Sequence, residues 1–207
     1  MTTITDPTIP HDHQGDWRAR VRDSRWGSVL VLVFVTIAVV VGAFLVMRPD
    51  QGGDSVTAVQ IDGVAAAPKV GGTAPAFTAT TLDGAPISLE ELKGRPVWLV
   101  FMASWCTACR AEAPDIQTAH QQAGPDGVAV VAVYLNEDAS AVRAYTQRLG
   151  LTFTHLPDPD AEIAAAYGVK GIPAHFFIDG AGVVRATALG ILSPQQIDEA
   201  VAEAGRS

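Results

Sequence analysis

Basic side chains are scarce in this chain: 14 lysines and arginines stand against 22 aspartates and glutamates, and the net charge is −8. Binding to nucleic acid needs a basic face, so this composition argues against such a partner. Cysteine is scarcer still, with only Cys106 and Cys109 among 207 residues. A closed zinc site needs four ligands, and neither a second cysteine pair nor a closely spaced histidine pair is present in the second half of the chain. We therefore expect no structural metal and no bound cofactor.

Charge is absent from Trp26 to Met47, a run of 22 residues that is the most apolar of the sequence. As a helix it would extend roughly 33 Å, which is long enough to cross a bilayer. Four arginines precede it, at positions 18, 20, 22 and 25. Because lysine and arginine stay on the cytoplasmic side, we expect a cytoplasmic tail at 1–25, a single-pass anchor in the cell membrane at 26–47, and everything after Arg48 outside.

A cleaved signal peptide is the competing interpretation of this run. Its apolar core would usually span only about 7 to 15 residues and would be followed directly by a site of small residues. The first such site, Ala65 to Ala67, comes too late, so an uncleaved anchor is favoured.

The rest of the chain predicts a tether and one α/β domain. Residues 48–72 are rich in Gly, Asp, Ala and Val without a clear period, which is typical of a linker. From 73 to 207, short apolar strands alternate with helices, which predicts a mixed sheet flanked by helices. The expected strands are 76–89 (two, around a turn), 95–103, 128–135, 174–178 and 183–189; the expected helices are a short one after Ser88 and those at 106–123, 139–149, 161–167 and 194–204.

The sequence Cys106-Thr-Ala-Cys109 has three physical interpretations. As a structural staple it closes so small a loop that the chain-entropy model yields only roughly 2 kcal/mol. As a metal site it lacks partner ligands, since His120, His155 and His175 are widely scattered. As a redox pair at the start of a helix it is well placed: unpaired backbone N–H groups lower the pKa of the first thiol, and the second cysteine can displace a mixed disulfide. The redox interpretation is favoured.

Two motifs together carry a resemblance to a known family. The segment "WCTACRAEAP" is followed by "GIPAHFFIDGAG", which begins 57 residues after its end, and the pair resembles the thioredoxin superfamily, in particular its membrane-anchored thiol-disulfide oxidoreductases of the TlpA/ResA type. The likeness covers about 73–204. It implies a thioredoxin-like fold, with a central mixed sheet flanked by helices and one transmembrane helix before it.

The resemblance also implies roles for individual residues. Cys106 would be the exposed nucleophile and Cys109 the resolving thiol of a redox-active disulfide, with Glu112 one turn later tuning thiol ionisation. Trp105 would flank the site, and Pro173 would be a cis-proline against the CxxC motif, with the Ile172 backbone available to an incoming peptide. Pro114 would kink the active-site helix, and the interval from Tyr134 to Ala161 resembles an insert that is typical of this subfamily.

The chain departs from the family pattern at two positions. Most relatives have Pro just before the second cysteine, where this chain has Ala108. Plain thioredoxins hold a buried carboxylate six residues before the nucleophile, where this chain has Val100. The first difference affects the reduction potential and the second leaves the proton of Cys109 to Glu112, water or substrate.

The leading functional prediction is a membrane-tethered, extracytoplasmic thiol-disulfide oxidoreductase. The resemblance suggests that it reduces disulfides of secreted proteins such as apocytochrome c and receives electrons from a membrane thiol carrier. Oxidation of secreted thiols uses the same residues and stays open. A peroxidase is disfavoured because its cysteine usually follows Thr or Ser by three residues, where this chain has Ala103. Copper delivery, with His175 as third ligand, is disfavoured because such proteins usually space their cysteines CxxxC.

Overall fold

The computed structural model describes residues 25–46 and 55–206. Apart from Arg25, the cytoplasmic tail expected at 1–25 lies outside these residues. The chain divides into two compact units, one that contains helix α2 and one that contains everything described from residue 55 onward.

Helix α2 spans Arg25–Val46 and coincides with the predicted apolar run. Its side chains are described for residues 29–41, and all of them are exposed. Within residues 25–46 and 55–206, no helix combines the length and the hydropathy that a membrane span needs. The transmembrane anchor expected at 26–47 is therefore not supported by the structure and rests on the sequence alone.

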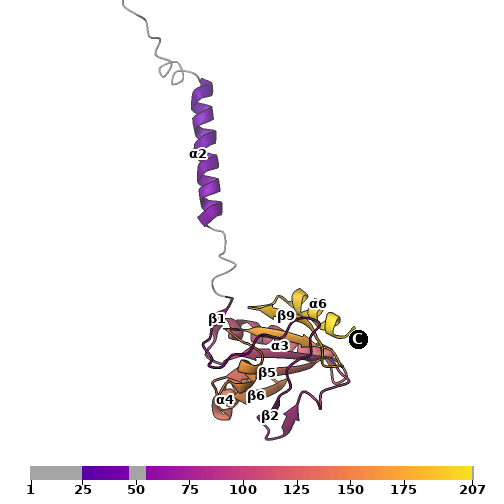
Figure 1. Cartoon of the computed structure of the whole chain (residues 1–207). Coiled ribbons are helices and arrows are strands. Elements are labelled where there is room, and N and C mark those ends of the chain that lie inside the picture. The colour runs from indigo at the N-terminus through magenta and orange to yellow at the C-terminus, as the bar shows by residue number, and fades with distance from the viewer. Residues whose placement is uncertain (1–24, 47–54, 207) are drawn as a thin grey trace, which may run out of the picture. The chain divides into compact units, whose positions relative to one another are not determined.

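A five-stranded mixed sheet forms the centre of the second unit (Figure 1). Its strand order is β6-β5-β4-β8-β9. Strands β4, β5 and β6 are parallel to one another, while β8 and β9 run antiparallel to their neighbours. These strands are β4 (Val97–Met102), β5 (Ala129–Leu135), β6 (Thr154–Asp158), β8 (Ala174–Ile178) and β9 (Val184–Leu189). The central strands β4 and β8 are buried along their whole length, which explains why they read as unbroken apolar runs.

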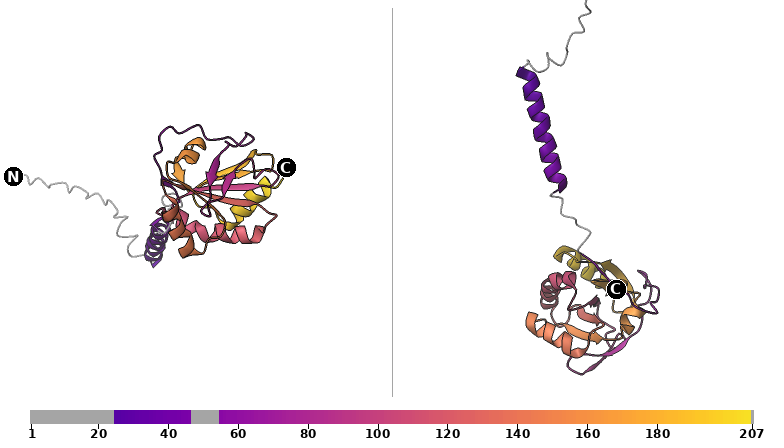
Figure 2. Two further views of the ribbon diagram at one scale, coloured as in Figure 1. Left: turned by 90° about the horizontal axis from the view of Figure 1, so that it is seen from below. Right: turned by 90° about the vertical axis from the view of Figure 1, so that its left-hand side faces the viewer.

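Helices cover both faces of this sheet. Figure 2 shows α3 and α6 on one face and α5 on the other. The helix bounds are α3 (Thr107–Ala123), α4 (Ala139–Leu149), α5 (Glu162–Ala166) and α6 (Pro194–Ala204). Ser193 caps α6 in a complete capping box with Gln196, as the sequence predicts. The thioredoxin-like α/β fold is thus confirmed.

Two small ladders complete the unit. The hairpin of β2 (Thr78–Thr80) and β3 (Pro86–Ser88) surrounds the predicted turn. The other ladder joins β1 (Thr57–Ala58) to β7 (Gly171–Ile172). Strand β1 lies inside the segment 48–72, which was expected to be a tether. Part of that expectation is wrong, because residues between 55 and 72 pair with a strand of the domain and form backbone hydrogen bonds with it. Among them, the Val59 and Ala65 N–H groups donate to the carbonyls of Lys170 and Ala165.

Two other sequence expectations differ from the structure. Strand β6 was not predicted, because Pro157 interrupts a short and partly polar segment; the structure places this strand at the edge of the sheet, where a proline is tolerated. The short helix expected after Ser88 is a series of turns. The Ser88 hydroxyl does bond the Glu91 carboxylate and N–H, but few residues separate β3 from β4, and so short a helix cannot offset the cost of nucleation.

Candidate active site

Strand β4 delivers the two cysteines to one end of the sheet. The chain leaves Met102, passes through Ala103 to Trp105, and enters α3 with Cys106 as the N-cap residue. The Cys106 backbone is extended, and its Sγ accepts a hydrogen bond from the Cys109 N–H at 3.1 Å. A sulfur thus takes the place that a Ser or Asp oxygen usually has at a helix start. Once the disulfide is reduced, the positive end of α3 favours a thiolate at this position.

The two cysteines are joined as a disulfide, with their Cα atoms 5.3 Å apart. Cys109 is fully buried, as expected. Cys106 is only 1 % exposed, which contradicts the exposed nucleophile that the resemblance implies. Thr57 of β1 lies against it, with its Oγ1 3.6 Å from the Cys106 Sγ.

The second motif of the sequence meets the first one in space. The Ile172–Pro173 peptide bond is cis, as the resemblance implies. The carbonyl oxygen of Ile172 lies 4.0 Å from the Cys106 Sγ, so β7 runs beside the cysteine pair. Trp105 is 48 % exposed next to the site, where it is available to a partner. The structure therefore brings together Cys106, Ile172 and Pro173, although the binding roles of Trp105, Ile172 and Pro173 stay predictions.

Glu112 is fully buried in α3, three residues after Cys109 and therefore on the same side of the helix. Its Oε1 accepts a hydrogen bond from the Leu192 N–H at 2.8 Å. Its Oε2 has no hydrogen-bond partner among the described residues. Burial is the main cause that raises the pKa of Glu112 to about 7, while the Leu192 N–H acts in the opposite direction. A carboxyl with this pKa can take up and release a proton near neutral pH.

His175 is the buried neighbour of Glu112. Its Nδ1 accepts from the Trp98 indole N–H at 3.3 Å, and its Nε2 lies 3.1 Å from the Gly190 carbonyl oxygen. Nδ1 is therefore the unprotonated nitrogen and Nε2 carries the hydrogen. Burial lowers the pKa of His175 to about 4, so the ring is neutral at physiological pH.

This bonding of His175 bears on the copper alternative. Both ring nitrogens are engaged inside the protein, which leaves none free to bind a metal. Within the part of the chain that the structure describes, no group of three or more His, Cys, Asp or Glu side chains is arranged to hold a metal ion.

Glu137 is a site residue that the sequence interpretation missed. It is buried just after β5, and its carboxylate accepts hydrogen bonds from the N–H of Ser104, at 2.7 Å, and from the Ser104 hydroxyl. Ser104 lies two residues before Cys106, so Glu137 fastens the loop that carries the cysteine. A signal was available: 95–103 and 128–135 were both predicted as buried strands with a helix between them, and residues that follow parallel strands meet at one edge of the sheet.

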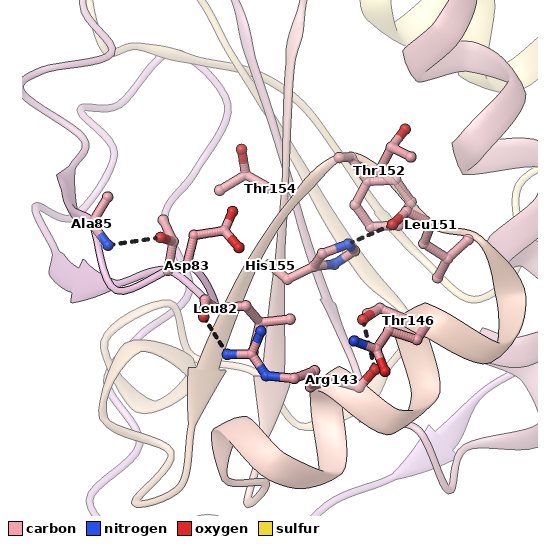
Figure 3. A pocket seen from close by; sticks show the side chains of 12 residues that line it. Leu82, Asp83, Ala85, Arg143, Thr146, Leu151, Thr152, Thr154 and His155 are labelled. Carbon is pink, nitrogen blue, oxygen red and sulfur yellow. Dashed lines mark hydrogen bonds between the residues drawn. The ribbon is translucent and has the colours of Figure 1, made fainter.

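A separate polar groove of about 470 Å³ lies between the β2–β3 turn and α4 (Figure 3). Arg143 donates to the Leu82 carbonyl there, and His155 bonds Tyr134 and the Leu151 carbonyl. Arg143 and His155 thus have hydrogen-bond partners within the protein. None of the predicted site residues lines it, and it carries no functional assignment.

Comparisons with known proteins agree with this geometry. The model of the AhpC/TSA family matches residues 70–187. The thiol-disulfide oxidoreductase ResA of Bacillus anthracis is 32 % identical over 130 residues, which are 63 % of this chain and 75 % of that protein.

Solved structures show the same relationship. A secreted Mycobacterium tuberculosis disulfide oxidoreductase, described as homologous to E. coli DsbE, shares 34 % identity at a TM-score of 0.55, and the match covers 61 % of this chain and 94 % of that one. A putative thiol:disulfide interchange protein DsbE from Chlorobium tepidum shares 30 % identity at a TM-score of 0.60, with 65 % and 99 % covered. The chain therefore belongs to the AhpC/TSA family of thioredoxin-fold proteins and is a thiol-disulfide oxidoreductase of the ResA and DsbE type.

Proposed function

We propose that this oxidoreductase reduces disulfides of proteins outside the cytoplasm. The observation that carries the proposal is the position of the Cys106 sulfur, which caps α3 and lies 4.0 Å from the Ile172 carbonyl beside the cis-proline. This position stabilises the thiolate and puts it next to a strand edge that can hold an extended peptide.

The reaction is a two-step exchange. The Cys106 thiolate attacks one sulfur of a substrate disulfide, a mixed disulfide forms, and the other substrate sulfur leaves as a thiolate. The Cys109 thiolate then attacks the Cys106 sulfur and releases the second substrate sulfur. The substrate gains two electrons and the Cys106–Cys109 pair loses them.

Glu112 is the proposed proton acceptor for Cys109. The two residues are three apart on α3 and both are buried, so water does not compete readily for the proton. With its pKa raised to about 7 by burial, Glu112 can hold the proton of the Cys109 thiol before attack and return it afterwards.

The direction of electron flow is tested by the equilibrium of the cysteine pair with glutathione. A reductase should have a potential near or below roughly −220 mV, in the range of reducing thioredoxin-fold proteins. A value near about −120 mV would match a strong oxidant and would overturn the proposed direction. Ala108 is the observation that favours the oxidase as second candidate, because most relatives have a proline there.

The proposed substrate is apocytochrome c or another secreted protein, and the proposed electron donor is a membrane thiol carrier. Support comes from the family resemblance and from the ResA relative. Trapping of partners by a Cys109→Ala variant in cells, followed by mass spectrometry, identifies them. If none of the trapped proteins were secreted, the proposal would be contradicted.

Membrane tethering is the remaining part of the proposal. Its support is the charge-free run 26–47 with four arginines before it. In cells that carry the Val56→Asp variant, which should expose Cys106, a membrane-impermeant thiol reagent added to intact, reduced cells should label Cys106. Labelling that occurs only after lysis would place the domain inside, and release of the protein by high salt or carbonate would exclude an integral anchor.

A further inference from the structure

The edge of β7 beside the cysteine pair is occupied by the chain itself. Strand β1 pairs antiparallel with β7, in a register that sets Thr57 opposite Ile172 and Ala58 opposite Gly171. The Val59 N–H continues the contact by donating to the Lys170 carbonyl at 3.1 Å. This is the strand edge at which an incoming peptide is expected, so residues 55–58 lie where a substrate would bind.

The side chain of Thr57 lies against the reactive sulfur. Its Oγ1 is 3.6 Å from the Cys106 Sγ. In threonine the Oγ1 is attached to Cβ, as the Sγ is in cysteine, so the Thr57 hydroxyl stands where a cysteine sulfur of a bound peptide would stand. A hydroxyl cannot form a disulfide, which makes the contact unreactive.

The side chain of Val56 packs on two glycines, Gly171 and Gly190. A Cβ atom on Gly171 would come within 2.8 Å of the Val56 Cγ1, and one on Gly190 would come within 3.0 Å of the Val56 Cγ2. Gly190 also has a positive φ of 91°, which a side chain would strain. The two glycines thus make room for a branched aliphatic side chain directly before the position of Thr57.

We propose that residues 55–58 are an internal stand-in for the substrate and must leave the β7 edge before a substrate disulfide can reach Cys106. The substrate class that fits the vacated site is an extended polypeptide segment, paired antiparallel with β7, in which a small branched aliphatic residue directly precedes the cysteine. This inference rests on the proposed function and names the substrate geometry of the same site.

The occupation of the β7 edge by residues 55–58 has two consequences for substrate binding. Because the segment is covalently attached, it competes at a high effective concentration, and only proteins that bind the edge well displace it. The apparent affinity for substrate is the intrinsic affinity multiplied by the fraction of molecules in which the β7 edge is open. Cys106 is 1 % exposed in the structure that has this contact.

A designed cross-link tests the register in the full-length chain, purified in detergent. The variant Thr57→Cys combined with Cys109→Ala carries one thiol at position 57 and one at Cys106. With oxidised glutathione as the oxidant, the two thiols should become one internal disulfide while two glutathione thiols are released. Non-reducing peptide mapping and a mass loss of two hydrogens identify the product.

The matched control is Ala58→Cys combined with Cys109→Ala. Successive side chains of a strand point to opposite faces, and Ala58 is exposed where Thr57 is half-buried. This control should give glutathione adducts and no internal disulfide. Equal cross-linking at both positions, or none at position 57, would overturn the inference.

A second measurement tests displacement. Val56→Asp puts a charge over Gly171 and Gly190 and should release the segment, so the reduced protein should react with iodoacetamide at Cys106 about tenfold faster or more, a change of about 1.4 kcal/mol. Val70→Asp, at an exposed position that is 60 % accessible, is the control and should react as the wild type does. Unchanged reactivity of Val56→Asp would overturn the inference. Failure of the wild-type protein to exchange with any disulfide would instead overturn the proposed function, since the cross-link and alkylation results do not depend on turnover.

Discussion

The Oε1 of Glu112 lies 3.5 Å from the Nε2 of His175, and both side chains are shielded completely from solvent. The ring is neutral because Trp98 bonds its Nδ1 and burial lowers the pKa of His175 to about 4. The contact is therefore not an ion pair, and His175 does not offset the charge of an ionised Glu112. This explains why the pKa of Glu112 stays high, at about 7.

The first prediction concerns the pH dependence of stability. The pKa of Glu112 rises from 4.5 to about 7 on folding. Between these values the folded protein holds a proton that the unfolded chain has lost, so this group lowers the free energy of unfolding as pH rises, by about 1.4 kcal/mol per pH unit and about 3 kcal/mol in total. Glu112→Gln should remove this decline, as measured by urea unfolding of the oxidised protein from pH 4 to pH 8.

The control for this experiment is Glu199→Gln, which removes one charge from an exposed position of α6. It should retain the decline of the wild type. Parallel pH profiles for the wild type and Glu112→Gln would show that Glu112 does not titrate in this window.

His175 should prove structural. His175→Leu leaves the Trp98 N–H and the Gly190 carbonyl without partners, at a cost of about 1–3 kcal/mol for each buried group. The free energy of unfolding should therefore fall by roughly 2–6 kcal/mol. His175→Gln, which can still accept and donate, should recover part of it. Nitrogen NMR should find Nε2 protonated and Nδ1 bare from pH 5 to pH 8, and the opposite tautomer would refute the assignment.

The two cysteines should differ in trapping. Cys109→Ala should accumulate mixed disulfides through Cys106, because attack still occurs and release does not. Cys106→Ala should trap almost nothing, since Cys109 is fully buried. Non-reducing gels of cell extracts distinguish the variants, and equal trapping by both would contradict the assigned roles.

The Ser104–Glu137 contact should stabilise the active-site loop. Glu137→Ala leaves the partly buried Ser104 N–H without its acceptor and should lower the free energy of unfolding by about 1–3 kcal/mol. Ser104→Ala removes only the hydroxyl bond and should cost about 1 kcal/mol or less. If Glu137 positions Cys106, the potential of the pair should also move in Glu137→Ala and return in Glu137→Gln. A potential that is identical in all variants would limit the role of Glu137 to stability.

Ala108→Pro tests the missing proline. Ala108 is the second residue of α3, where the N–H has no acceptor within the helix, so the fold should tolerate the change. The proline removes one N–H from the positive helix end, which destabilises the thiolate and should lower the reduction potential by roughly 10–30 mV. Glutathione equilibration measures it, and an unchanged potential would mean that this dipeptide does not set the redox poise.

The fold was predictable where side-chain pattern and burial coincide. Strand β4 reads as a continuous apolar run because both its faces are covered, and α4 was predicted with the bounds it has. Strand β6 escaped prediction because Pro157 argues against a strand unless its edge position is known. Strands β1 and β7 have two residues each, too few to produce a period, and they exist only through contacts that are remote in sequence.

The site was predictable to the extent that chemistry is local. The CxxC pair and its helix follow from spacing, and the cis-proline follows from the family resemblance. The Glu137 contact, the His175 bonds and the contact of Thr57 with Cys106 join residues from 15 to 77 positions apart only in the folded chain. Hydrophobic periodicity reflects local structure only, so it does not predict contacts between residues this far apart.

Val100 lies directly opposite His175 in the β4–β8 ladder, at the position where plain thioredoxins have a carboxylate. The buried acid of this chain instead comes from the same helix as Cys109. The separation between Cys109 and Glu112 is thus held by the covalent backbone of α3 and its internal hydrogen bonds, and it does not depend on how the helix rests on the sheet. Substitutions in the sheet, Val100 included, can consequently change the polarity around the cysteine pair without altering the spacing between the Cys109 thiol and the Glu112 carboxyl. The residues of β4 can therefore adjust the reduction potential independently of that spacing.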